Sequence, residues 1–193
     1  MAHAIPCLQK GRKMKTSLKK EFEVEQPPVV VWQYLINPEE VVECVPGVSI
    51  DEKVSDNAYK GKVGLKFGPI SANYNADIIY DEVNVEDQTI RLVGKGVDAK
   101  GMGNAEMQLD LDLSEKDGGG SHVDAVMDVT INGKIAQFGS RLVEDVSNQL
   151  FKQFVANFTK KLEGVEISEA DQNVDAGGMI KSVVKGLFSS KKS

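Results

Sequence analysis

The sequence predicts an α+β domain in which a curved antiparallel sheet surrounds one long C-terminal helix, with two short helices after the first strand. Two patterns support this fold class. Apolar and polar residues alternate through most of the segment from Lys15 to Ile131, which gives each strand one apolar face. From Ile135 to Leu162 the apolar residues recur every three or four positions, as in an amphipathic helix. Strands followed by a helix that covers one sheet face make an α+β domain.

The N-terminal part predicts one strand and two short helices. The first strand covers residues 15–25, where apolar residues alternate with lysines and glutamates. The proline pair at 27–28 can begin a helix, and residues 29–36 (VVVWQYLI) follow as a short apolar one. A second short helix, residues 38–45, carries glutamates in its first turn. A Pro-Gly pair at 46–47 then returns the chain to extended structure.

The middle of the chain predicts about six antiparallel strands, each with one apolar face. Turn residues such as Gly68-Pro69 and the run Asp117 to Gly120 separate them. The clearest alternation covers residues 59–67, 70–80, 104–113 and 123–131, with a less regular strand at 89–96.

The helical pattern that starts at Ile135 extends over about 28 residues, which at roughly 1.5 Å each is on the order of 40 Å. Such a helix could cross a whole sheet. The two short helices could close one end of the space between them. This architecture favours a cavity for an apolar ligand.

Charge and composition divide the chain into four parts: an N-terminal extension (1–13), the domain (14–163), a flexible acidic linker (164–178) and a basic amphipathic segment (179–193). The net charge is −6, although both terminal parts are basic and lack acids. The domain is therefore strongly acidic, which argues against nucleic acid as a partner.

Several other classes of protein are disfavoured. No apolar run approaches the roughly 18 residues of a membrane-spanning helix. Two cysteines make a disulfide framework improbable and favour a reducing cytoplasm. His122 lies on the polar face of its strand without a second histidine or cysteine nearby, so no metal site is predicted. The glycines between 94 and 103 join two strands and do not precede a helix, as a phosphate cradle would require. No catalytic residue is predicted.

The candidate cavity residues are aromatic and apolar side chains on the inward faces of these elements. For any single one, an ordinary core position is the commoner outcome, so the cavity is argued from the architecture. The candidates are Trp32, Tyr34, Phe67, Tyr74, Ile78, Met107, Leu109, Met127, Phe138, Leu142 and Val146.

Four stretches together resemble the CoxG family, the G subunits of carbon monoxide dehydrogenase, within the START/Bet v 1-like (SRPBCC) helix-grip superfamily. They are PPVVVWQYLINPEEVVECVPGV (27–48), KVGLKFGPISANYNADI (62–78), GKGVDAKGMGNAEMQL (94–109) and VTINGKIAQFGSRLVEDVSNQLFKQF (129–154). The resemblance implies a helix-grip fold and a role beside a molybdenum hydroxylase such as carbon monoxide dehydrogenase. It also implies a lipophilic ligand, a respiratory quinone or a lipid, with no covalently bound cofactor.

The C-terminal segment predicts membrane docking. Its apolar pairs fall on one helical face and its lysines lie elsewhere, which is typical of a helix in a membrane interface. The alternative is a tail that docks on its own protein or in a partner's groove. The expected location is cytoplasmic, peripheral to the inner face of the cell membrane, with anionic lipid as the contact. The docking residues are Met179, Ile180, Lys181, Val183, Val184, Lys185, Leu187, Phe188, Lys191 and Lys192.

Three functions are consistent with these patterns. The first is a non-catalytic accessory protein that binds a lipophilic ligand. The second is an enzyme like the polyketide cyclases or dehydratases, with Tyr74 and Tyr80 as acid–base candidates. The third is a protein-binding accessory factor that needs no ligand.

Overall fold

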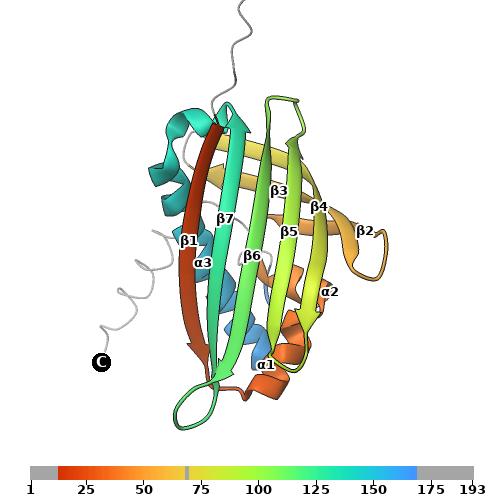
Figure 1. Cartoon of the computed structure of the whole chain (residues 1–193), viewed down its shortest axis with the longest axis vertical. Coiled ribbons are helices and arrows are strands. Elements are labelled where there is room, and N and C mark those ends of the chain that lie inside the picture. The colour runs from red at the N-terminus through yellow and green to blue at the C-terminus, as the bar shows by residue number, and fades with distance from the viewer. Residues whose placement is uncertain (1–12, 68–69, 169–193) are drawn as a thin grey trace, which may run out of the picture.

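The structure, a computed structural model, describes residues 13–67 and 70–168 (Figure 1). Of the predicted extension, 1–13, only Lys13 is described, and it begins β1; the whole predicted docking segment, 179–193, lies outside the described residues. In chain order the elements are β1 (Lys13–Val24), α1 (Pro28–Leu35), α2 (Pro38–Cys44), β2 (Val48–Lys53), β3 (Ala58–Phe67), β4 (Ile70–Asn84), β5 (Thr89–Asp98), β6 (Gly103–Glu115), β7 (Ser121–Gly133), the 3-10 helix η1 (Ile135–Phe138) and α3 (Ser140–Leu162).

The strands form one seven-stranded sheet in the order β1-β7-β6-β5-β4-β3-β2, with every neighbouring pair antiparallel. Figure 1 shows α3 crossing behind the curved sheet, with α1 and α2 at one end of the molecule. The predicted α+β class, with a long C-terminal helix and two short helices after the first strand, is confirmed.

Cross-strand register defines the inner face of the sheet. Leu18 pairs with Met127, Met127 with Leu109, Leu109 with Leu92, and Leu92 with Tyr80. Because directly opposed residues in an antiparallel pair share a face, this row runs across five strands on one side. The period-two alternation in the sequence is the cause of this continuous apolar surface.

The packed core lies at the end of the molecule that α1 and α2 close. Pro28 begins α1, and the side chain of Asn37 caps α2 by accepting a hydrogen bond from the Glu39 backbone N–H at 3.2 Å. The buried cluster there contains Val24, Val31, Trp32, Leu35, Cys44, Tyr80, Ile90, Leu113, Val123 and Phe158.

The prediction of one continuous helix from Ile135 is wrong. Residues Ile135–Phe138 form a 3-10 turn, and α3 begins at Ser140. Between them Gly139 adopts φ 80° and ψ 173°, a backbone conformation that is essentially restricted to glycine. The apolar spacing runs through this break, so periodicity alone could not reveal it.

Candidate functional site

The long helix α3 is fully buried only near its C-terminal end, at Asn157 and Phe158. Its main contacts are with α2 and β1. Protein interiors normally pack without such accessible apolar surface, so most of this stripe is incompletely covered by its neighbours. The partly accessible apolar residues of α3 are Leu142, Val143, Val146, Leu150, Phe151, Phe154 and Val155.

Two glycines of β5 on the inner face of the sheet leave room for neighbouring side chains. Gly94 and Gly96 of β5 pair with Met107 and Ala105 of β6 on the inner face. A Cβ atom at Gly96 would lie 3.2 Å from the Cβ of Tyr74, so the missing side chain lets Tyr74 lie against β5. At Gly94 the nearest atom would be Cε of Met107, at 3.4 Å. Both glycines therefore make room for larger inward-facing neighbours.

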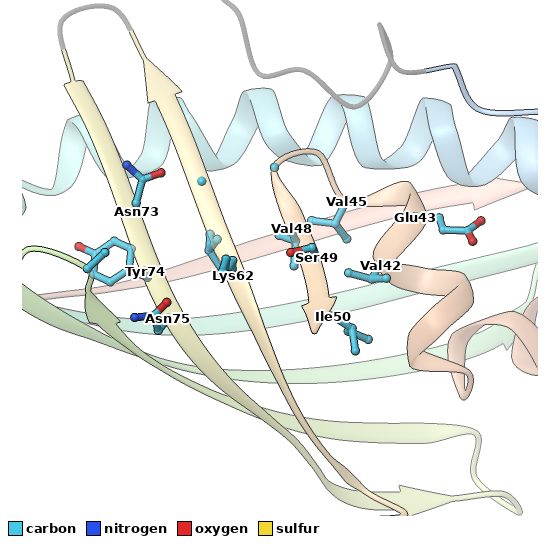
Figure 2. A pocket seen from close by; sticks show the side chains of 14 residues that line it. Val42, Glu43, Val45, Val48, Ser49, Ile50, Lys62, Asn73, Tyr74 and Asn75 are labelled. Carbon is cyan, nitrogen blue, oxygen red and sulfur yellow. The ribbon is translucent and has the colours of Figure 1, made fainter. Parts of the chain in front are cut away.

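A pocket of about 820 Å³ opens beside β2, between α2 and the β3–β4 hairpin (Figure 2). Its volume is within the usual range for small-molecule sites. One wall is aliphatic and comes from α2, β2 and β3, whereas Lys62, Asn73 and Asn75 supply polar groups. The described lining residues are Val42, Glu43, Val45, Gly47, Val48, Ser49, Ile50, Lys62, Val63, Gly64, Asn73, Tyr74, Asn75 and Ala99.

Of the eleven residues predicted to line a cavity, Tyr74 alone is among the described lining of this pocket. Met107, Leu109 and Met127 lie together on the inner face of β6 and β7, and each is partly buried. Ile78 of β4 pairs with Gly94 on the same face.

The remaining candidates lie at four different places. Leu142 and Val146 belong to the accessible stripe of α3. Trp32 is 6% exposed within the packed cluster, and Tyr34 meets Phe158 edge to face with ring centroids 6.4 Å apart. Phe138 lies in η1 and is 55% exposed. Phe67 ends β3, and its side chain is outside the description.

Two polar groups lie near the interior, and one of them, Lys20, was not among the predicted residues. Lys20 pairs with Ala125, which places it on the inner face of β1; its Nζ donates to Oδ1 of Asn148 on α3 and lies 5.8 Å from the ring centroid of Phe151. Trp32 Nε1 is buried, and no described residue accepts a hydrogen bond from it. The alternation of Leu18, Lys20 and Phe22 was the signal that could have identified Lys20.

The two tyrosines of the enzyme hypothesis are poorly suited to proton transfer near neutral pH. Burial, followed by the charge of Asp98, raises the pKa of Tyr74. Burial, followed by the nearby Tyr59, raises the pKa of Tyr80 strongly. Asp98 is the carboxylate paired with Tyr74, but its Oδ1 accepts the backbone N–H groups of Lys100 and Met102 at 2.9 and 3.2 Å. That carboxylate stabilises the β5–β6 turn.

Among the residues that the structure describes, one group of side chains could hold a metal ion, on the outer face of β1 and β7. Ligand atoms of Glu21, His122 and Asp124 all lie within 4.8 Å of one another. Lys19 Nζ is 3.5 Å from Asp124 Oδ1 and neutralises part of this charge. Glu21 comes from β1, whereas His122 and Asp124 come from β7, so strand pairing was needed to bring the three side chains together.

Comparison with known proteins gives a family and a fold. The sequence profile of CoxG, the G subunit of carbon monoxide dehydrogenase, matches residues 21–163. A conserved protein from Geobacillus kaustophilus has a similar structure, with a TM-score of 0.70 at 19% identity over 77% of this chain and 96% of its own. No curated protein matches the sequence significantly.

Two further structures share the architecture at lower similarity. A protein from Rhizobium leguminosarum has a TM-score of 0.55 at 13% identity, over 79% of this chain and 97% of its own. Norcoclaurine synthase from Thalictrum flavum also has a TM-score of 0.55, at 10% identity, over 78% of this chain and 88% of its own. These likenesses show the fold, and they confirm the predicted Bet v 1-like helix-grip architecture.

Within residues 13–67 and 70–168, no helix is both long and apolar enough to cross a membrane. The matched segment begins within β1 and ends just after α3, so it includes every other element of the sheet and all the helices. It also contains the pocket and the accessible stripe of α3. The chain therefore belongs to the CoxG family of carbon monoxide dehydrogenase G subunits.

Proposed function

We propose that this protein is a non-catalytic accessory protein of a molybdenum hydroxylase of the carbon monoxide dehydrogenase type. It holds a lipophilic molecule of the respiratory quinone class between its sheet and α3. The observation that carries this proposal is the apolar stripe of α3, from Leu142 to Val155, which stays partly accessible although Phe151 and Phe154 meet Phe22 of β1 edge to face. Family and fold both support an accessory protein that binds a hydrophobic ligand.

A lipophilic ligand fits this interior for an energetic reason. Apolar surface left accessible to water costs roughly 25 cal/mol per Å² relative to buried surface, so a hydrophobic occupant stabilises the domain by covering it. A quinone also presents two carbonyl oxygens, which require donors. Lys20 and Asn148 supply donors beside the stripe, and the pocket offers Lys62, Asn73 and Asn75.

The C-terminal segment is the basis for the cellular location that we propose. Residues 179–193 combine three apolar pairs with four lysines and no acid. We assign them to reversible docking on the anionic inner face of the cell membrane, where a quinone resides. The protein would then carry its ligand between the bilayer and the enzyme, on the cytoplasmic side.

Catalysis on a hydrophobic substrate is a second candidate, and Asp98 beside Tyr74 is the observation that favours it. The turn hydrogen bonds of that carboxylate argue against it as an acid or base. A ligand-free protein-binding factor is less consistent with the accessible apolar interior.

Organic extraction of the purified full chain, followed by mass spectrometry, tests the proposal. We expect a near-stoichiometric quinone, or protein that takes up an added quinone in a saturable manner. The variant Tyr74→Phe removes only a hydroxyl and should keep its ligand, because no step depends on that group. Protein that is isolated empty and refuses added quinones would contradict the proposal; a chemically altered ligand after incubation, lost in Tyr74→Phe, would favour catalysis.

A further inference from the structure

One end of the domain carries basic residues without partners. Strand register places the start of β1, the β5–β6 turn and the end of β7 together, with the end of β3 near that turn. The helix η1 and the start of α3 lie beside them (Figure 1, upper end). We call this the basic end. Its exposed basic residues are Lys13, Lys66, Lys100, Lys134 and Arg141.

None of these five residues forms an ion pair with any described residue. Other lysines of the domain do: Lys62 with Asp51 at 2.6 Å, and Lys116 with Glu25 at 2.6 Å. The acid at the basic end, Asp98, is held by the backbone of its own turn. Further from this end, Glu106 lies opposite Lys95 across strands β5 and β6, and Glu144 and Asp145 follow Arg141 along α3. The basic end therefore presents five exposed cations that form no ion pair with any described residue.

The opposite end, at α1, α2 and the β6–β7 turn, is acidic. Its lysines are already paired there, for example Lys161 with Glu40 at 2.6 Å. The domain is thus polarised along its length. The acids of this end are Glu23, Glu25, Glu39, Glu40, Glu43, Asp81, Glu82, Glu86, Asp87, Asp112, Glu115, Asp117, Asp124, Glu163 and Glu166.

Large apolar side chains project among the unpaired cations. Phe138 of η1 is 55% exposed, and Met102 of the β5–β6 turn is 37% exposed. The backbone N–H of Lys134 donates to the carbonyl of Met102 at 3.2 Å, which ties the β5–β6 turn to the residue that precedes η1. Exposed valines at the other end, such as Val85 at 67%, lie beside Glu86 and Asp87. Only the basic end combines exposed apolar groups with unpaired cations in the described part of the chain.

The pocket reaches this same end. Ala99, which lines it, precedes Lys100, and the Ala99 backbone N–H donates to the Asn73 carbonyl at 2.7 Å. A surface that contacted Lys100 and Met102 would therefore lie next to the wall of the pocket formed by Asn73 and Ala99.

We propose that the basic end is itself a docking surface for an anionic lipid bilayer, separate from the C-terminal segment. Phe138 and Met102 enter the interface, and the five cations lie at the level of the lipid phosphates. The acidic end is repelled, so the domain is oriented with the Asn73–Ala99 wall of its pocket toward the membrane. This inference rests on the proposed function, because the contact serves a purpose only if a quinone leaves the bilayer and enters the domain past this wall.

Site-specific fluorescence tests the orientation in the full chain. An NBD fluorophore is attached to Phe138→Cys in a Cys7→Ser background, with Val85→Cys as the matched position at the acidic end. Cys44 is fully buried and does not compete for the label. On addition of vesicles of phosphatidylcholine and phosphatidylglycerol in equal parts, emission at position 138 should rise at least about twofold and move to shorter wavelength. Emission from a label at position 85 should not change with these vesicles. Vesicles of phosphatidylcholine alone should change the emission at neither position.

Charge reversal supplies an independent measurement. The pair Lys100→Glu and Lys134→Glu should lower vesicle affinity by about tenfold or more, because each cation near an anionic surface contributes measurably. The control pair, Lys60→Glu and Lys152→Glu, changes the net charge of the protein by the same amount, but at positions away from the basic end. Equal affinities of the two pairs would overturn the proposal.

The outcomes separate this inference from the proposed function. Vesicles that retain the chain without a change at position 138 would mean that the C-terminal segment docks alone; the inference fails while the proposed docking stands. No retention at all would refute both membrane assignments, although ligand extraction would still test the cavity. A change at position 138 with purified carbon monoxide dehydrogenase, and none with vesicles, would assign the basic end to the enzyme and overturn the lipid assignment.

Discussion

Cys44 shows how burial controls chemistry at a single residue. It ends α2, is 0% exposed and contacts the carbonyl of Glu40 through its sulfur at 3.5 Å. Burial raises the pKa of the Cys44 thiol from 9.0 to about 11; Lys161 opposes this shift, whereas Glu43 and Glu40 add to it. The thiolate is therefore disfavoured in the folded state, and a nucleophilic role is excluded near neutral pH.

This raised pKa predicts a pH dependence of stability. A group whose pKa is higher in the folded state stabilises the fold below its unfolded pKa, and that contribution disappears as the pH approaches the folded value. Between about pH 9 and pH 11 the Cys44 term should remove up to about 2–3 kcal/mol from the free energy of unfolding. Urea unfolding at pH 8 and pH 10.5 should show a smaller loss in Cys44→Ala than in the native chain. Equal losses would contradict the assignment, since Tyr80 and Lys161 titrate in both proteins.

At the scale of elements, the junction between η1 and α3 depends on one glycine. Gly139 has φ 80° and ψ 173°, and no atom lies within 4 Å of the position where a Cβ would stand. The requirement for glycine there is thus one of backbone conformation and not of space. The junction also determines the direction in which η1 presents Phe138.

Gly139→Ala should lower the free energy of unfolding by about 1–3 kcal/mol, because alanine is strained in this region of backbone space. Ser140→Ala is the matched control at the exposed start of α3 and should change stability by less than about 0.5 kcal/mol. Urea unfolding measures both. A Gly139→Ala protein of unchanged stability, with increased helical circular dichroism, would instead support the continuous helix that the sequence predicted.

Helices and strands were predictable from the sequence where a regular spacing of apolar residues within the segment determines them. The alternation in residues 15–25 predicted β1 because a strand with one wet face requires it, and Asn37-Pro38 correctly marked the start of α2. The break at Gly139 was missed because the helical spacing of apolar residues continues through it. A glycine beside Ser140, which begins α3, was the local signal that could have revealed it.

The pocket was less predictable than the fold because it depends on long-range pairing. Val48 of β2 meets Val63 of β3, which places the α2–β2 turn beside the β3–β4 hairpin. No spacing within either segment encodes that contact. Selecting residues by size favoured Trp32 and Tyr34, which lie in the packed end, over smaller lining residues such as Val42 and Asn73.

The two ends of the molecule that differ in charge also differ in packing. Its acidic end contains the buried cluster, where Val31, Val123 and Phe158 are each 0% exposed. Its basic end carries the start of α3, whose apolar residues remain accessible. A domain of this kind concentrates its stability at one end, and the other end is the one to which we assign the proposed ligand entry and membrane contact.

This division predicts opposite responses to added side-chain volume. Val31→Phe forces a large group into the closed end and should destabilise the domain by about 1–3 kcal/mol, as overpacking does. Val146→Phe adds the same volume to the accessible stripe of α3 and should cost less than about 1 kcal/mol, because space is available there. Urea unfolding compares the two stabilities. The Val146→Phe protein should also carry less extractable ligand than the native chain, since the new ring occupies the space of the ligand. If Val146→Phe destabilised the domain as much as Val31→Phe, the interface between sheet and helix would be fully packed and the binding proposal would lose its structural basis.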